Sequence, residues 1–265
     1  MLNHVIVGHG TPLLILHGVR LDHRHMMESL EPLFETLDGW QRVYVDLPGH
    51  GASPPQGTIR SMDDVLDALV TFVDAHLPGQ RFGVIGESRG SYLASGMADR
   101  RPELVLGLAL VVPGGAPGSD PARLPTHEVL VADPSLREGL AENQIDRFDN
   151  LMVIQNQRLL DMAERSKIPA VALYDHSQEQ RVFSAFHFSN EMNGETYGHD
   201  GPTVIILGRQ DSMSGYLDRI DLLPQYPRAS LAVLDAAGHA VAWERPEVFQ
   251  SLIRDWLDRL ALVTE

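Results

Sequence analysis

The sequence predicts an α/β fold: a mostly parallel, doubly wound sheet with an inserted helical cap. Short apolar runs alternate with amphipathic helical segments over residues 1–114, which is typical of a parallel sheet covered on both faces. The alternation stops at about residue 115 and resumes at about residue 196. We therefore expect a core of residues 1–114 and 196–265, with residues 115–195 inserted as a mostly helical cap.

The expected strands of the core are short apolar runs, and a continuous run of this kind suits a strand buried on both faces. They cover residues 13–16, 43–45, 82–85, 104–112, 204–207 and 230–234, after a weakly alternating segment at residues 2–7. Helices are expected at residues 25–37, 61–73, 92–100 and 246–262. Ser61 is suited to cap the second helix, because Asp63 and Asp64 follow in its first turn.

The cap begins with a stretch rich in Gly and Pro, and no convincing buried strand appears in it before residue 203. Apolar residues at three- and four-residue spacing predict one amphipathic helix over residues 145–165. The apolar residues on this stripe are Ile145, Phe148, Leu151, Met152, Leu159 and Met162.

Composition excludes several classes of function. The formal net charge of −15 argues against binding to nucleic acid or to an anionic membrane surface, because both need clustered Lys and Arg. The chain has no cysteine, which excludes disulfides, thiolate catalysis and Cys-ligated zinc. No apolar stretch approaches the ~18 residues of a membrane span, and no signal peptide is visible. We expect a cytoplasmic protein that acts on a small molecule.

Two further compositional points complete this picture. Lys167 is the only lysine in the chain, which we attribute to compositional bias without functional content. No feature of the sequence specifies an oligomeric state.

The segment Gly-Glu-Ser-Arg-Gly at residues 86–90 directly follows an expected strand and directly precedes an expected helix. In a parallel sheet this order places Ser88 on the sharp turn between the two elements. Gly86 and Gly90 lack a Cβ, so strand and helix can approach closely and the serine hydroxyl is exposed. The pattern predicts a nucleophile at Ser88 if the rest of the chain supplies a base and an acid.

Other polar residues also follow the carboxyl ends of expected strands, the edge at which ligand crevices form in open α/β sheets. They are His17-Gly18-Val19, Asp46, Asp211 and His239. A serine nucleophile needs a base, and a histidine base needs an acid that fixes its tautomer. Asp211 and His239 follow Ser88 in the chain order Ser, Asp, His, which is the order expected for a serine on such a turn. Asp235, four residues before His239, is a rival acid.

Four motifs in this order resemble those of the α/β-hydrolase superfamily, in its capped single-domain form, over residues 1–114 and 200–265. They are His17-Gly18 after a strand, Asp46-x-Pro48-Gly49-x-Gly51-x-Ser53, Gly86-x-Ser88-x-Gly90, and Gly208-x-x-Asp211 followed by Gly238-His239. The resemblance implies the α/β-hydrolase fold and a reaction that uses water but no metal or organic cofactor.

The resemblance also implies a role for each matching residue. Ser88 would be the nucleophile and His239 the general base and then acid. Asp211 would be the orienting carboxylate, because this superfamily places its acid after the strand that follows the cap. The backbone N–H groups of Val19 and Arg89 would form the oxyanion hole.

The implied activity is a serine hydrolase that cleaves a small or medium ester, lactone or related acyl bond through an acyl-enzyme. An alternative is hydrolysis of a carbon–carbon bond in a β-diketone-like compound by the same three residues. A third hypothesis, from another class, is a small-molecule receptor or pseudo-enzyme on the same fold. Serine at position 88 argues against haloalkane dehalogenases and epoxide hydrolases, which use an aspartate there.

The remaining histidines and Asp46 are expected to be structural. His17 would support the loop that carries Val19, and His50 would pack within its Pro-Gly-His-Gly turn. Asp46 would fix the turn that follows its strand. His23 and His25 resemble a pair of metal ligands, but no third ligand has suitable spacing, so we expect no metal site.

The charged residues that flank the nucleophile, Glu87 and Arg89, depart from the usual pattern of the superfamily. Charges at this turn must be paired or solvated. Either both are paired within the fold, or Arg89 faces the pocket and favours an acidic or strongly polar substrate.

The cap is expected to roof the pocket with apolar side chains. The candidate pocket residues are Met152, Phe183, Phe186 and Trp243, with Phe188, Met162 and Met192 as further apolar residues of the cap. The alternative is that these side chains form the cap's own core and that Trp243 serves packing alone.

Overall fold

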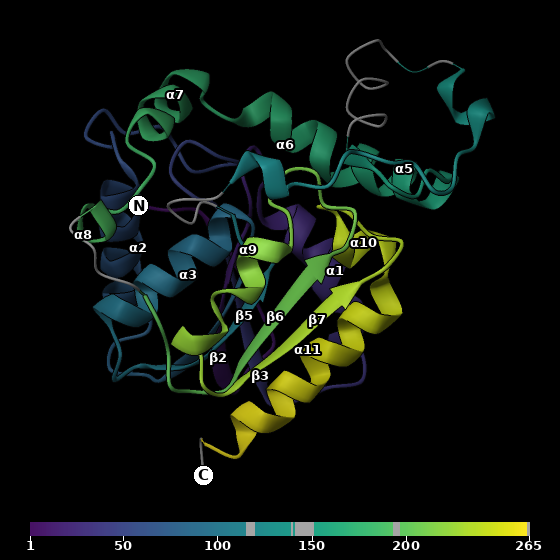
Figure 1. Cartoon of the computed structure of the whole chain (residues 1–265). Helices are drawn as coiled ribbons and strands as arrows, with labels where there is room; N and C mark the ends of the chain where they lie inside the picture. Colours follow the sequence, from purple (N-terminus) through teal and green to yellow (C-terminus); the bar gives the residue numbers. More distant parts are fainter. Residues whose placement is uncertain (115–119, 139, 141–150, 193–196, 264–265) are drawn as a thin grey trace.

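The computed structural model describes residues 1–114, 120–138, 140, 151–192 and 197–263 (Figure 1). A seven-stranded sheet runs through the molecule in the order β1-β3-β2-β4-β5-β6-β7. The strands are β1 (His4–Val7), β2 (Thr11–Leu16), β3 (Trp40–Val45), β4 (Phe82–Glu87), β5 (Val105–Val111), β6 (Thr203–Gly208) and β7 (Ala229–Leu234). Only the pairing of β1 with β3 is antiparallel in this sheet. The predicted α/β class is confirmed.

The described helices fall into two groups, those of the core and those between β5 and β6. The core helices are α1 (His23–Phe34), α2 (Met62–His76), α3 (Arg89–Arg100), α9 (Leu217–Ile220), α10 (Val241–Glu244) and α11 (Pro246–Ala261). Those between β5 and β6 are α5 (Gln157–Met162), α6 (Ile168–Leu173), α7 (His176–Ser184) and α8 (Ser189–Met192). Among the described helices, none combines the length and the apolar character that a membrane crossing requires.

Two hydrophobic clusters cover the two faces of the sheet. Because successive side chains of a strand point to opposite faces, Leu13 and Ile15 belong to one cluster and Leu14 and Leu16 to the other. Residues of α1 and α11 complete the first cluster, and residues of α2 and α3 complete the second. The central strands are therefore buried on both sides, as their continuous apolar runs predict.

The start of α2 follows from its sequence. The Ser61 hydroxyl accepts a hydrogen bond from the Asp64 amide at 3.2 Å, and the Asp64 carboxylate accepts one from the Ser61 amide at 3.0 Å. This reciprocal pair satisfies two backbone donors that the first turn of a helix leaves without partners. The predicted N-cap at Ser61 is confirmed.

The segment between β5 and β6 differs from its prediction in one respect. Ile145 and Phe148 of the predicted helix over residues 145–165 lie outside the described residues. Over residues 152–156 the prediction of a continuous helix is wrong, because Ile154 forms a β-bridge with Val131 and Asn156 caps a new helix, α5. Helices α5 to α7 lie beyond the carboxyl ends of the strands, toward which the arrowheads of β6 and β7 point (Figure 1).

Candidate active site

Ser88 lies between the last residue of β4 and the first residue of α3. Its backbone has φ 54° and ψ −117°, a conformation that is unfavourable for any residue with a Cβ. The flanking glycines permit the turn, since a Cβ on Gly86 would lie 2.2 Å from the Gly90 carbonyl oxygen. A Cβ on Gly90 would lie 2.3 Å from the carbonyl oxygen of Leu16 in β2. Strained backbone of this kind persists where surrounding packing enforces it, and it is typical of functional sites.

The structure brings Ser88, His239 and Asp211 together from three separate strand ends. His239 Nε2 lies 3.0 Å from Ser88 Oγ, and His239 Nδ1 lies 2.9 Å from Asp211 Oδ2. Because Nδ1 donates its hydrogen to the carboxylate, Nε2 is left as the acceptor for the serine hydroxyl. This tautomer is the one that can remove a proton from Ser88.

Asp211 is fully buried, and its Oδ1 accepts hydrogen bonds from the amides of Met213 at 2.9 Å and Ser214 at 3.0 Å. Burial alone would raise the pKa of Asp211, but the charge of His239 and these hydrogen bonds outweigh it and lower the pKa. Burial alone would lower the pKa of His239, but the charge and hydrogen bond of Asp211, with the charge of Glu87, raise it above its ordinary value. Asp211 therefore remains ionised and stabilises a protonated His239.

Asp235, the rival acid, does not occupy this position. Its side chain is exposed, and its Oδ1 accepts a hydrogen bond from Gln210 Nε2 at 2.8 Å. The structure thus places Asp211, and not Asp235, on His239 Nδ1.

The loop that carries Val19 lies against the nucleophile. A Cβ on Gly18 would lie 3.3 Å from Ser88 Cβ, and Val19 lines the same cavity as Ser88. The Val19 amide makes no backbone hydrogen bond to any other described residue. The Arg89 amide is the first of α3 and so has no acceptor within the helix. Arg89 directly follows Ser88 and Val19 lines the same cavity, and the oxyanion hole formed by their two N–H groups stays a prediction.

His17 holds this loop in place. Its Nε2 accepts a hydrogen bond from the Leu47 amide at 3.0 Å, so Nδ1 donates to the Gly18 carbonyl at 2.7 Å. Complete burial lowers the pKa of His17 to about 4, which keeps the imidazole neutral and preserves this donor–acceptor arrangement. These contacts are those of a supporting residue for the loop.

A cavity of about 600 Å³ opens over the Ser88 hydroxyl. Its apolar wall comes from Leu21, Leu151, Val171, Phe183, Met213 and Ala240, and its polar wall includes Arg20, His25, Glu87 and Lys167. The volume is within the ordinary range for small-molecule sites. The site is therefore large enough for a substrate of drug-like size.

Of the four predicted pocket residues, Phe183 lines this cavity. Met152 instead packs in the first hydrophobic cluster, and Trp243 is buried there with its indole N–H donating to Ser29 Oγ at 3.0 Å. Phe186 stacks between Phe183 and Tyr92, with ring centroids 5.4 and 5.8 Å away. Placing Met152, Phe186 and Trp243 on the pocket wall was wrong, because packing within the protein satisfies these side chains.

Met162 and Phe188 are likewise buried in the two hydrophobic clusters, Met162 in the first and Phe188 in the second. The side chain of Met192 lies outside the described residues. For Met162 and Phe188, the alternative that these side chains serve packing is the one that fits the structure.

The charged neighbours of Ser88 are paired, but not with each other. Glu87 lines the cavity, and its two carboxylate oxygens lie 2.8 and 2.9 Å from His25 Nε2. Arg89 points away from the cavity, and its Nη1 lies 2.8 and 2.9 Å from the two carboxylate oxygens of Glu179 on α7. The alternative in which Arg89 faces the pocket is wrong, because a buried carboxylate between the sheet and α7 binds it.

His50 belongs to the same buried cluster as Arg89. Its Nε2 accepts a hydrogen bond from Arg89 Nη2 at 3.0 Å, and its Nδ1 donates to the Pro48 carbonyl at 3.0 Å. Burial and the charge of Arg89 keep the pKa of His50 well below its ordinary value, so the imidazole is neutral. The partners of His25 and Arg89 come from distant parts of the chain, and no local sequence signal indicates them.

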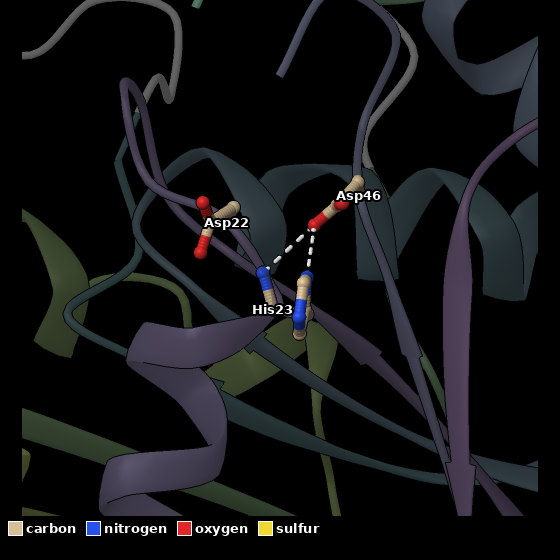
Figure 2. Close-up of side chains that lie close together, drawn as sticks. All are labelled: Asp22, His23 and Asp46. Carbon is tan, nitrogen blue, oxygen red and sulfur yellow. Dashed lines mark hydrogen bonds and ion pairs between the residues drawn. The ribbon is translucent and has the colours of Figure 1, made fainter. Parts of the chain in front are cut away.

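Asp46 organises the turn after β3, as Figure 2 shows with Asp22 and His23 beside it. Its carboxylate accepts hydrogen bonds from the His23 amide at 2.9 Å, His23 Nδ1 at 2.8 Å, Asn3 Nδ2 at 2.7 Å and the Ala52 amide at 3.0 Å. Potential metal ligands of Asp22, His23 and Asp46 lie within 4.8 Å of one another. The hydrogen bond of His23 Nδ1 to Asp46 raises the pKa of His23 above its ordinary value. The cluster is a hydrogen-bonded support for the turn.

Comparison with known proteins identifies the family. The family model of the alpha/beta hydrolase fold matches residues 11–246, which is most of the chain. The chain belongs to the α/β-hydrolase fold family.

Relatives within this family are enzymes with different substrates. The chain is 26% identical over 235 residues to a 2-hydroxy-6-oxononadienedioate/2-hydroxy-6-oxononatrienedioate hydrolase of Cupriavidus pinatubonensis, covering 86% of this chain and 79% of the relative. It is 29% identical over 270 residues to a monoacylglycerol lipase of Mus musculus, covering 94% of this chain and 76% of the lipase.

Solved structures show the same fold over nearly the whole chain. An α/β-superfamily hydrolase of Oenococcus oeni superposes with a TM-score of 0.88 at 25% identity, covering 98% of this chain and 96% of that one. A thermophilic esterase of Thermogutta terrifontis superposes with a TM-score of 0.69 at 23% identity, covering 98% and 93%. This α/β-hydrolase is accordingly an enzyme, and its expected family is confirmed.

Proposed function

We propose that this α/β-hydrolase is a serine hydrolase that cleaves an acyl bond through an acyl-enzyme on Ser88. The observation that carries the proposal is the continuous hydrogen-bonded chain from Ser88 Oγ through His239 to Asp211, with the serine open to a cavity. A serine hydroxyl alone is a poor nucleophile, and this arrangement supplies the base and the carboxylate that it needs.

In the acylation step, Ser88 Oγ attacks the acyl carbonyl while its proton passes to His239 Nε2. The carbonyl oxygen becomes an oxyanion and accepts hydrogen bonds from the amides of Val19 and Arg89. Asp211 stabilises the imidazolium and keeps Nε2 directed at the reacting atoms. The bond to the leaving group then breaks as His239 returns the proton to that group.

In the deacylation step, water replaces the leaving group. His239 removes a proton from water as the hydroxyl oxygen attacks the Ser88 ester, and the same two amides hold the second oxyanion. Collapse of this intermediate releases the carboxylic acid and returns the proton to Ser88. Each step moves a proton through His239, so no metal or organic cofactor is required by the chemistry.

The substrate we propose is a small or medium ester, lactone or related acyl compound. The cavity of about 600 Å³ and its side chains Leu151, Val171 and Phe183 support an acyl group with an apolar part.

A second candidate is hydrolysis of a carbon–carbon bond in a β-diketone-like compound, and one comparison favours it. The relative of Cupriavidus pinatubonensis is a 2-hydroxy-6-oxononadienedioate/2-hydroxy-6-oxononatrienedioate hydrolase. The same three residues would act, with His239 delivering its proton to carbon in place of oxygen. The receptor or pseudo-enzyme hypothesis lacks comparable support, since the named relatives are enzymes.

Burst kinetics with short p-nitrophenyl esters test the serine mechanism. We expect a burst of p-nitrophenol close to one equivalent in the wild type, and a loss of about 10³-fold or more in kcat for Ser88→Ala. Ser95→Ala is the matched control, because Ser95 lies on the same helix and its hydroxyl bonds to the Ser91 carbonyl. Equal rates for Ser88→Ala and the wild type would exclude Ser88 as the nucleophile.

The acid is tested by comparing two aspartate variants. Asp211→Asn keeps the shape of the side chain but favours the wrong histidine tautomer, so we expect kcat to fall by roughly 10³- to 10⁴-fold. Asp235→Asn changes an exposed carboxylate that does not contact His239, and we expect wild-type activity. Loss of activity in Asp235→Asn alone would show that the acid is misassigned.

A further inference from the structure

The first turn of α7 binds the loop that follows β3. The Gln178 side chain is buried, and its Nε2 donates a hydrogen bond to the Pro48 carbonyl at 2.6 Å. Its Oε1 accepts one from the Gln56 amide at 2.7 Å. The Asp175 amide donates to the Gly49 carbonyl at 2.7 Å. Both ends of the Gln178 amide are therefore used to hold α7 against this loop.

The close approach of α7 to the loop depends on Gly49. Its φ is 74°, a left-handed conformation that favours glycine. A Cβ at this position would lie 2.8 Å from Gln178 Nε2, so there is no room for a side chain between the loop and α7. The backbone of the loop is thus placed directly by the side chain of Gln178.

The same loop fixes the peptide group that carries the Val19 N–H. Leu47, the residue before Pro48, donates its amide hydrogen to His17 Nε2, and His17 Nδ1 donates to the Gly18 carbonyl at 2.7 Å. The Gly18 carbonyl and the Val19 N–H belong to one planar peptide group and point in opposite directions. By holding the carbonyl, His17 therefore also sets the direction of the Val19 N–H.

A second series of contacts joins α7 to Arg89, whose amide is the other predicted donor of the oxyanion hole. The Pro48 carbonyl that accepts from Gln178 also accepts from His50 Nδ1 at 3.0 Å. His50 Nε2 in turn accepts from Arg89 Nη2 at 3.0 Å. Glu179, the next residue of α7, binds Arg89 Nη1 at 2.8 Å. Two adjacent residues of α7 are thus connected to both predicted donors.

The exposed side of the Val19 loop also contacts the segment that leads into α7. Arg20 has φ 59°, a left-handed conformation that is uncommon for a residue with a Cβ and needs support from its surroundings. Its guanidinium lies 5.3 Å from the centroid of the Tyr174 ring. Tyr174 directly precedes Asp175, the residue that caps α7. The loop is therefore held from its buried side and from its exposed side.

We propose that Gln178 is a positioning residue for the oxyanion hole, through which α7 keeps the N–H groups of Val19 and Arg89 in the direction that the reaction needs. This inference rests on the proposed function. Gln178 is not among the described residues that line the cavity, so its effect passes through the loop after β3 and not through contact with the substrate. Phe183, in the last turn of α7, does line the cavity. One helix therefore contacts the substrate and supports the groups that stabilise its oxyanion.

Gln178→Met tests the inference, because methionine has a similar length but makes neither hydrogen bond. An oxyanion donor acts in the transition state, so a misdirected donor lowers kcat and leaves KM nearly unchanged. Complete removal of a donor costs about 10²- to 10³-fold in kcat. For a donor that is misdirected but present, we expect a loss of about tenfold with p-nitrophenyl esters, and a KM within about twofold of the wild type. Rates are taken per active site, counted by stoichiometric phosphonylation of Ser88.

Gln180→Met is the matched control on the same helix. Gln180 is exposed, and its Nε2 lies 3.0 Å from His176 Nε2 within α7, so we expect wild-type kcat and KM. The inference is overturned if Gln178→Met has the same kcat as Gln180→Met. It is also overturned if Gln178→Met raises KM with kcat unchanged, because α7 would then only bind the substrate.

A trifluoromethyl ketone separates a positioning role from general loosening of the protein. Its hemiketal with Ser88 carries an oxyanion, so we expect its Ki to rise about tenfold in Gln178→Met, in step with the loss of kcat. Binding of the uncleaved ester to Ser88→Ala should change by less than about twofold when Gln178→Met is added. A purely structural role would weaken both ligands alike, and that result contradicts the inference.

Hydrogen exchange measured by mass spectrometry reports on the loop itself. We expect faster exchange at residues 17–21 in Gln178→Met than in the wild type, with exchange in β7 unchanged. Unchanged exchange at residues 17–21 counts against the inference. Gln178→Asn keeps the amide on a side chain one carbon shorter, and it remains a test if the methionine variant does not fold. We expect a loss of about threefold in kcat, and wild-type kcat and exchange in this variant would contradict the inference.

The outcomes also separate this inference from the proposed function. If the wild type shows no Ser88-dependent hydrolysis, the serine hydrolase proposal fails and the positioning role fails with it. If Ser88-dependent hydrolysis occurs but Gln178→Met behaves as Gln180→Met does, the hydrolase stands and only the positioning role fails.

Discussion

Replacing Glu179 by glutamine would leave the guanidinium group of Arg89 buried without its counter-charge. The two side chains are 2% and 4% exposed, and Arg89 Nη1 contacts both carboxylate oxygens at 2.8 and 2.9 Å. The only other side-chain hydrogen bond of Arg89 among the described residues is with the neutral His50.

Removing one partner of a buried ion pair costs about 3–5 kcal/mol, because the remaining charge is desolvated and uncompensated. The glutamine amide keeps one oxygen acceptor for Arg89, so we expect about 3 kcal/mol, the lower end of that range. For a chain of this length, this corresponds to a decrease in Tm of roughly 6–12 °C. The double variant Arg89→Met/Glu179→Leu removes both charges and leaves neither uncompensated. It should therefore lose much less stability than the sum of the losses in the two single variants.

Urea unfolding followed by tryptophan fluorescence measures these changes in the free energy of unfolding. Asp74→Asn is the matched control, since it breaks the ion pair with Arg101 at the surface, where Asp74 is 49% exposed. An exposed pair contributes less than about 1 kcal/mol, so this variant should resemble the wild type. If Glu179→Gln destabilises the protein no more than Asp74→Asn does, the buried pair does not hold α7 on the core.

Two further predictions concern the base and the turn at Ser88. The pKa of His239 is raised above 6.5, so kcat/KM should fall as pH decreases through a value above 6.5, where the base becomes protonated. Glu87→Gln removes a charge that raises this pKa, so the acid limb should move to lower pH; a limb that stays or moves upward contradicts this. Gly90→Ala places a Cβ 2.3 Å from a backbone carbonyl oxygen and should destabilise the protein by about 3 kcal/mol in thermal unfolding. Gly57→Ala, where a Cβ meets no atom within 4 Å, should change stability by less than about 0.5 kcal/mol, and equal effects at both positions would refute the steric account.

Features that depend on neighbouring residues could be predicted from the sequence. The strand–Ser88–helix turn follows from two glycines at fixed spacing, and the Ser61 cap follows from a carboxylate three residues later. The approach of His239 and Asp211 to Ser88 could also be predicted, although the residues are far apart. All three follow carboxyl ends of parallel strands, and such ends meet at one edge of the sheet.

The pocket wall could not be predicted in the same way, because an apolar side chain is equally suited to a cavity and to a core. Met152 and Trp243 are as apolar as Phe183, yet both are buried in the first hydrophobic cluster while Phe183 is 48% exposed at the cavity. Hydropathy alone does not distinguish these environments. The interruption of the predicted helix before Asn156 could not be predicted either, since the apolar spacing in the sequence continues across it.

The charges on either side of Ser88 show why long-range partners decide the character of this site. Glu87 and Arg89 are two residues apart, but they contact His25 and Glu179, which are 62 and 90 residues away and lie on helices at different places over the sheet. Glu87 is the last residue of β4 and Arg89 is the first residue of α3, and their side chains contact different helices, α1 and α7. Arg89 therefore binds α7, the helix that carries Phe183. Glu87 instead lines the cavity together with His25 and Lys167. The two charges beside Ser88 therefore have different effects: Arg89 pairs with Glu179 of α7, and the charge of Glu87 contributes to raising the pKa of His239.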